Sequence, residues 1–294
     1  MVAERWTKTL ADFPANKAKF DADLAVWTAG ETAAKASGEK FTKQKPRPPQ
    51  GPGHQNTPSG LNNAMIAPLA PYALRGAIWY QGESNAGRAS EYRALFSAMI
   101  TGWRSQFAQG DFPFYQAQLA NFQSNNADAT EWAFLREAQT QTLALPATGQ
   151  AVIIDIGDVR DIHPRNKKDV GRRLARLALA RDYGIKIADS GINIADSGPV
   201  FDKAERDGAS FRVSFTATDG GLIAPLNTLS AFELAGEDKV FKPAEAQIDG
   251  LTVLVTSVEI PAPVAVRYAW RNAPVAGLFN KEGLPAVPFR SDTW

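Results

Sequence analysis

Three short apolar runs alternate with three amphipathic stretches between residues 76 and 184, and this alternation limits the fold more than any other feature of the chain. The apolar runs, each typical of a buried strand, cover residues 76–81, 112–119 and 151–156. The amphipathic stretches, each typical of a helix, cover residues 90–107, 131–145 and 167–184. Such alternation predicts an α/β fold of three layers, in which a parallel sheet is covered by helices on both faces. Functional residues are then expected after the carboxyl ends of the strands.

The sequence on either side of this region differs in character, which predicts three parts. Residues 1–60 combine a Lys- and Ala-rich stretch, predicted as two helices broken near Pro14, with a Pro- and Gly-rich linker. Residues 61–198 hold the α/β part. Residues 199–294 hold short β-rich segments separated by turn residues, which predict an antiparallel, sandwich-like domain.

Composition and charge exclude several classes of function. The 294-residue chain has a formal net charge of +1, no cysteine and two histidines. The charge predicts no nucleic-acid partner and no membrane surface, and the absence of cysteine excludes thiolate catalysis. Asp155 and Asp158 could be read as metal ligands, but no convergent motif supports them, so we expect no metal and no cofactor. The first residues lack an apolar signal core, which predicts no export signal.

His163 is the strongest candidate for a general base. It follows the third apolar run in "DVRDIHPRNK", where catalytic groups collect in parallel sheets. Asp161 and Asp158 precede it by two and five residues, and either carboxylate could orient the imidazole. We place Asp161 among the candidate catalytic residues, although Asp158 or a backbone carbonyl could equally hold the ring. The competing interpretation is a structural histidine in a loop.

The first apolar run ends in a cluster of polar and small residues, Gln81-Gly82-Glu83-Ser84-Asn85. One interpretation is a strand–helix turn in which Ser84 or Asn85 caps the next helix. The other is an oxyanion or substrate loop, because amides donate hydrogen bonds to developing negative charge and glycine allows close approach.

Arg136 and Gln139 lie one helical turn apart in "FLREAQ". Without further information, a solvated helix face with Glu137 as the partner of Arg136 is the favoured interpretation.

Five stretches together resemble the bacterial sialate O-acetylesterases, which are SGNH-type carbohydrate esterases. They are "GAIWYQGESNAGRASEYRALFSAMITGWR", "FPFYQAQLANF", "LREAQ", "DIGDVRDIHPRNKKDVGRRLA" and "VRYAW…NKEGLPAVPFRSD". The resemblance implies an SGNH/flavodoxin-like sheet and removal of O-acetyl groups from sialic acid or related sugars by a serine nucleophile and a histidine base. It implies that His163 is the base. It also implies that five residues lie at the substrate or the oxyanion, namely Gln81, Gly82, Glu83, Asn85 and Arg136.

One family motif has no counterpart in the sequence. The nucleophilic serine of the family lies in a "GQSN" segment upstream of this region, and the chain contains no such segment. We therefore expect the chain to correspond to the C-terminal part of such an esterase, with an incomplete sheet. Ser84 in "GESN" is the alternative nucleophile.

Two functions follow from this pattern. The first is an acetylesterase acting on an acetylated sugar. The second is an inactive fragment that binds sugars or a partner. An incomplete sheet would leave residues 76–81 as an apolar edge, which predicts either a homo-oligomer or coverage by the N-terminal helices.

Overall fold

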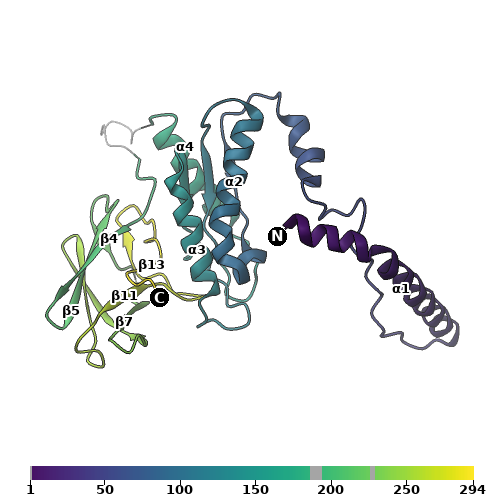
Figure 1. The fold of residues 1–294 in the computed structure, drawn as a ribbon. Helices are drawn as coiled ribbons and strands as arrows, with labels where there is room; N and C mark the ends of the chain where they lie inside the picture. The colour runs from purple at the N-terminus through teal and green to yellow at the C-terminus, as the bar shows by residue number, and fades with distance from the viewer. Residues whose placement is uncertain (1, 186–193, 226–228) are drawn as a thin grey trace. The chain divides into compact units, whose positions relative to one another are not determined.

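The computed structural model describes residues 2–185, 194–225 and 229–294 (Figure 1). The chain divides into two compact units, Met1–Ala73 and Leu74–Trp294. No helix among the described residues has the length and apolar character that a membrane span requires.

The first unit is built on one long helix, α1 (Val2–Ser37), which runs through Pro14. The prediction of two helices broken near Pro14 is therefore wrong. Ion pairs four residues apart lie on both sides of the proline, Lys8 with Asp12 at 2.8 Å and Lys17 with Asp21 at 2.6 Å. Such pairs and the Ala-rich composition favour helix strongly enough to offset the one hydrogen bond that proline removes.

The Pro- and Gly-rich segment that follows runs back along α1 without regular secondary structure. The Trp27 indole donates to the carbonyl of Lys43 at 2.8 Å, and its ring meets Phe41 edge-on at 5.5 Å. The unit ends in two short helices, η1 (Asn62–Ile66) and η2 (Ala67–Leu69).

The second unit begins with a parallel three-stranded sheet in the order β1-β2-β3. Its strands are β1 (Ala77–Trp79), β2 (Phe114–Ala117) and β3 (Thr148–Ala151). Its helices are η3 (Glu83–Arg88), α2 (Ala89–Phe107), α3 (Glu131–Gln141), η4 (Thr142–Ala144) and α4 (Lys167–Arg181). The parallel α/β arrangement confirms the coarse prediction of the fold.

Successive residues of β2 show why helices cover both faces of the sheet. The Phe114 ring meets Phe96 of α2 at 5.8 Å, and the Gln116 amide donates to the carbonyl of Gln139 on α3. Tyr115, between them, packs in the cluster that contains α4. Side chains alternate between the two faces of a strand, so α2 and α3 cover one face and α4 covers the other.

The third strand lies earlier in the chain than the predicted range of 151–156, and that prediction is wrong. Pairing with β2 ends at Ala151, although the next three residues are buried. Ile153 packs beside α4, while Val152 and Ile154 join the core of the C-terminal β region. The residues after Ala151 are therefore apolar because they are buried between two cores, and not because the strand continues.

The C-terminal β region is antiparallel, as predicted. One sheet has the order β4-β5-β10-β9, the second β13-β11-β7-β8, and β12 pairs with β6. The bounds are β4 (Val200–Asp207), β5 (Ser210–Thr216), β6 (Leu222–Ile223), β7 (Phe232–Ala235), β8 (Phe241–Pro243), β9 (Glu245–Asp249), β10 (Thr252–Thr256), β11 (Ala265–Tyr268), β12 (Phe279–Asn280) and β13 (Phe289–Arg290). Both four-stranded sheets contribute to one apolar core, which includes Val213, Val253, Leu234 and Val266.

Candidate active site

The carboxyl ends of the parallel strands lead into three segments, residues 80–88, 118–130 and 152–166. Gln139 on α3 joins the first two, because Oε1 accepts the N–H of Leu119 at 2.9 Å and Nε2 donates to the carbonyl of Gln81 at 3.2 Å. The N–H of Gln123 donates to the carbonyl of Val159 at 2.9 Å and joins the second segment to the third. The three segments therefore meet along one edge of the sheet.

Gln81 and Gly82 begin the first segment in a fixed conformation. The Gln81 amide donates to Oδ1 of Asn85 at 2.9 Å, and its Oε1 accepts the Tyr92 hydroxyl at 3.2 Å. Gly82 is buried with φ +153°, and a Cβ there would lie 3.2 Å from the amide nitrogen of Gln139. Only glycine combines this φ with so close an approach.

Ser84 lies in η3 and is exposed, whereas its neighbour Glu83 is half-buried. The cap of η3 is Gly82 and that of α2 is Arg88, so the interpretation of Ser84 or Asn85 as a helix cap is wrong. Within the described ranges, no hydrogen bond joins Ser84 to His163.

His163 lies on the segment after β3, with an imidazole that is 86% exposed. Its backbone N–H donates to Oδ1 of Asp161 at 2.9 Å, and its Nδ1 lies 3.9 Å from the same oxygen. The Asp158 carboxylate instead accepts the N–H groups of Arg160 and Asp161 at 2.9 and 3.2 Å. Asp161 is therefore placed beside the imidazole, while Asp158 shapes the turn.

Tyr80 lies at the junction of β1 and the first segment. Burial, with a smaller contribution from the charge of Glu83, raises the pKa of Tyr80 to about 12. The Lys167 ammonium lies 4.7 Å from the centre of its ring. Tyr80 therefore stays a neutral phenol at physiological pH.

Arg136 on α3 is fully buried, and its guanidinium donates to four backbone carbonyls. The acceptors are Leu119 at 2.8 Å, Ala120 at 2.7 Å, and Arg271 and Asn272 at 2.8 Å each. Burial lowers the pKa of Arg136 to about 9, so the side chain remains charged at neutral pH. This placement favours an effect on the site through the backbone, and contact with substrate remains a prediction.

The expectation that Arg136 and Gln139 lie on a solvated face is wrong, because both side chains are buried. Glu137, expected to pair with Arg136, instead accepts two hydrogen bonds from Arg290 of β13 at 2.8 and 3.0 Å. The sequence could have indicated this burial through the spacing of Trp132, Arg136 and Gln139 along α3. Residues four and seven positions after a buried Trp lie on the same face of a helix.

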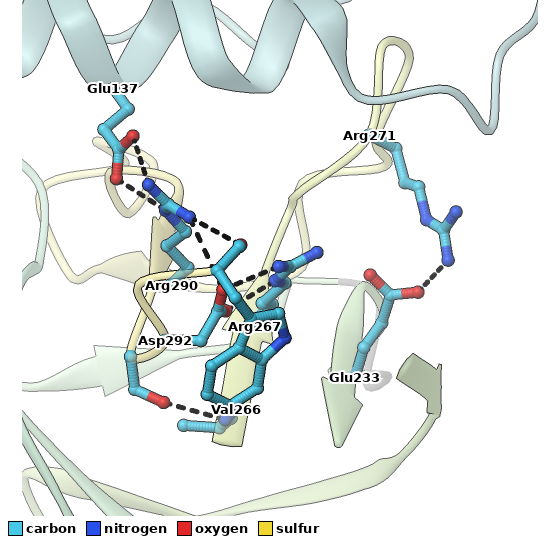
Figure 2. A network of polar contacts seen from close by, with 9 residues as sticks. Glu137, Glu233, Val266, Arg267, Arg271, Arg290 and Asp292 are labelled. Atoms are coloured by element: carbon cyan, nitrogen blue, oxygen red, sulfur yellow. Dashed lines mark hydrogen bonds and ion pairs between the residues drawn. The ribbon is translucent and has the colours of Figure 1, made fainter. Parts of the chain in front are cut away.

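A network of ion pairs joins α3 to the C-terminal β region (Figure 2). Arg290 contacts Glu137 on α3 and also lies 3.4 Å from Oδ1 of Asp292. Asp292 in turn accepts two hydrogen bonds from Arg267 at 2.7 Å each. A separate ion pair in the same view joins Arg271 to Glu233. The C-terminal β region is therefore attached to the helix that carries Arg136 and Gln139.

Two cavities adjoin the first segment, and Gly87 lines both. The smaller, about 230 Å³, is lined by Gly87, Asn125, Glu131 and Asn272, among others. The larger, about 520 Å³, is lined by the start of α2, by α3 and by Arg290. The smaller cavity has amide and carboxylate groups in its wall and lies between the first two segments.

The residues present do not form a metal centre in the part of the chain that the structure describes. No group of three His, Asp or Glu side chains converges there. Asp155, considered above as a ligand, is held by two hydrogen bonds from Arg173 at 2.5 and 2.6 Å.

Comparison with known proteins shows what this arrangement resembles. Residues 55–180 match a family model described as a carbohydrate esterase, sialic acid-specific acetylesterase. Sialate O-acetylesterase of Mus musculus is 32% identical over 79% of the chain and 47% of its own length. The Homo sapiens enzyme of that name is 30% identical over 79% of the chain and 48% of its length.

A solved structure shows the same similarity in three dimensions. A carbohydrate acetylesterase from Xanthomonas citri superimposes with a TM-score of 0.74 at 47% identity. The superposition covers 80% of this chain and 54% of that protein. The chain spans about half the length of the curated relatives it matches.

Proposed function

We propose that this chain removes O-acetyl groups from sialic acid or a related acetylated sugar, because residues 55–180 match the carbohydrate esterase family of sialic acid-specific acetylesterases. The observation that carries the proposal is the position of His163. His163 lies beside Asp161 in the third segment, and Ser84 lies in the first segment. Both segments begin at the carboxyl edge of the sheet. The proposed fold is the three-layer SGNH type, supported by the parallel sheet with helices on both faces.

In the proposed reaction, the Ser84 hydroxyl attacks the acetyl carbonyl while the His163 imidazole accepts its proton. Asp161 lies 3.9 Å from Nδ1 and would stabilise the imidazolium that forms. The imidazolium then returns the proton to the departing sugar oxygen. Water, activated by the same imidazole, releases acetate from the serine and restores the hydroxyl.

The oxyanion would be stabilised by donors of the first segment. The Gln81 amide already donates to Asn85, so the N–H of Gly82 and Nδ2 of Asn85 are the better-placed candidates. Glu83 is half-buried beside Tyr80 and would contribute to the shape of the segment. Arg136 would act indirectly, by holding the carbonyls of Leu119 and Ala120 at the end of β2.

Self-association through β1 is a further part of the proposal. Among the described strands, β1 pairs with β2 alone, which makes it an edge of the sheet, and Ile78 is 71% exposed. Exposed apolar edges favour pairing with a second chain. Light scattering of the Ile78→Lys variant should show a smaller species than the parent. Equal masses would remove this part of the proposal.

Labelling with a fluorophosphonate tests the nucleophile without requiring a natural substrate. We expect a mass increase on the peptide that contains Ser84, lost in Ser84→Ala and strongly reduced in His163→Ala. The exposed Ser105 of α2 provides a control, so Ser105→Ala should label normally. Labelling that persists in Ser84→Ala would assign the reaction to another hydroxyl, and absence of labelling in the parent would favour a binding function.

A further inference from the structure

Asn272, which follows β11 in the C-terminal β region, is 2% exposed and forms hydrogen bonds to the candidate active site. Its Nδ2 donates to the carbonyl of Asn126 at 3.1 Å and to a carboxylate oxygen of Glu131 at 3.0 Å. Its Oδ1 accepts the N–H of Trp132 at 2.9 Å. One buried amide therefore holds both the end of the second segment and the start of α3.

The backbone of Asn272 contributes three more hydrogen bonds. Its N–H donates to the carbonyl of Ala129 at 2.6 Å, and its carbonyl accepts the N–H of Phe122 at 3.2 Å. The same carbonyl accepts Nη2 of Arg136 at 2.8 Å. The second segment is thus attached to Asn272 near both of its ends.

The second segment has little internal structure of its own. It contains no strand or helix between Ala117 and Glu131, and Ser124, Asn125 and Asn126 are exposed. Its internal hydrogen bonds include Asp128 N–H to Oδ1 of Asn126 at 3.0 Å. A polar segment of this kind depends on contacts from outside to keep one conformation.

The small cavity shows what this conformation achieves. Its lining includes Ser124, Asn125 and Asn126 of the second segment, Gly87 of the first, and Asn272. Both donors and the acceptor of the Asn272 amide are used in hydrogen bonds, whereas the side chains of Ser124 and Asn125, which also line the cavity, form no hydrogen bond among the described contacts. At about 230 Å³ the cavity has room for one sugar ring, and hydroxyl and amide groups are suited to bind sugar hydroxyls.

We propose that Asn272 is a positioning residue that shapes a sugar-binding subsite, formed by Gly87 and residues 124–126, from the C-terminal β region. The subsite would take the ring of the acetylated sugar rather than the acetyl group, and in this respect the inference rests on the proposed function. The C-terminal β region is then part of the site, although the family model matches only residues 55–180.

The test compares Asn272→Asp and Asn272→Ala with Asn280→Ala in the full chain. Asn280 is a matched control because it is also buried in the C-terminal β region. Its Nδ2 donates to the carbonyl of Ser197 and its Oδ1 accepts the N–H of Leu284, each at 3.0 Å. Asn272→Asp keeps the acceptor for Trp132 and the side-chain volume, but it replaces the Nδ2 that bonds Glu131 by a carboxylate oxygen. Asn272→Ala adds no buried charge and is the second variant if the aspartate variant does not fold.

Hydrogen–deuterium exchange measures the positioning without requiring activity. We expect amides of residues 118–130 to exchange about tenfold faster in the Asn272 variants, with no change there in Asn280→Ala. Equal exchange in the parent and in a folded Asn272 variant would overturn the proposal, whether or not the chain is an esterase.

Kinetics then separates a sugar subsite from the reacting centre. With 9-O-acetyl-N-acetylneuraminic acid as substrate, Asn272→Asp should raise KM about tenfold, while kcat for p-nitrophenyl acetate, which has no sugar, should change less than about twofold. Equal losses on both substrates would overturn the subsite. A parent inactive on both would overturn the proposed function and leave the exchange result to decide the positioning role.

Discussion

Replacing Arg136 with methionine should destabilise the chain substantially. The substitution keeps most of the side-chain volume but removes the four hydrogen bonds to the carbonyls of Leu119, Ala120, Arg271 and Asn272. Those carbonyls lie in the interior, where a lost partner is costly. The change should therefore loosen the end of β2 and its connection to the C-terminal β region together.

Two opposing contributions set the size of the effect. Four hydrogen bonds from a charged donor contribute roughly 1.5–3 kcal/mol each, or about 6–12 kcal/mol in total. Burial of the charge offsets part of this stabilisation. It lowers the pKa of Arg136 from 12.5 to about 9, and this shift corresponds to a cost of about 5 kcal/mol at roughly 1.4 kcal/mol per pH unit. The difference leaves about 1–7 kcal/mol, and we expect a loss near 4 kcal/mol, within the range for breaking a buried ionic contact.

Urea denaturation of the parent and of Arg136→Met measures this loss directly. Arg104 gives a matched control, because it is 6% exposed and donates to the carbonyls of Phe112 and Pro146 at the opposite edge of the sheet. Arg104→Met should lose stability without changing exchange in residues 118–130, whereas Arg136→Met should change both. A stability of Arg136→Met within about 1 kcal/mol of the parent would refute the reasoning.

Three further predictions concern stability. Gly82→Ala should cost about 1–3 kcal/mol in urea denaturation, because φ is +153° and the added Cβ meets Gln139, whereas Gly87→Ala, with open space around it, should stay within about 0.5 kcal/mol. Gly171→Ala, in the interior of α4 with nothing near its Cβ, should raise the free energy of unfolding by about 0.5–1 kcal/mol. The free energy of unfolding of the parent should exceed that of Arg136→Met by a constant amount from about pH 6 to 8, and by a growing amount above pH 9. Above pH 9 native Arg136 releases a proton that the unfolded state retains, which stabilises the native parent. A difference that shrinks above pH 9 would contradict the lowered pKa of Arg136.

The parallel sheet was predictable because its signal is local. Alternating apolar and amphipathic stretches predicted three neighbouring strands, and α2 and α4 begin within one residue of the predicted ranges. The third strand was misplaced because Val152 and Ile154 are buried in a second core, and burial of that kind has the same sequence pattern as a strand. The break expected at Pro14 failed because its flanking residues favour helix more strongly than one proline opposes it.

The site was predictable only where its residues follow strands. That rule predicted His163 and Ser84 in segments that begin at the carboxyl edge of the sheet, where both lie, and their catalytic roles stay predictions. Asp161 lies beside the imidazole because it precedes His163 by only two residues. Asn272 gave no comparable signal, because its contact with Arg136 spans 136 residues and a lone asparagine between strands has no periodicity. Arg136 itself was misjudged because a charged residue is rarely buried without a carboxylate partner, and here backbone carbonyls take that place.

Acetate release from 9-O-acetyl-N-acetylneuraminic acid tests the central claim most directly. The parent chain should release acetate, and His163→Ala should lose this activity by at least about a hundredfold, as expected for removal of a general base. His54→Ala is the control, because His54 is the only other histidine and lies in the first unit, so its removal should leave the rate unchanged. Acetate release that is equal in the parent and in His163→Ala would contradict the account.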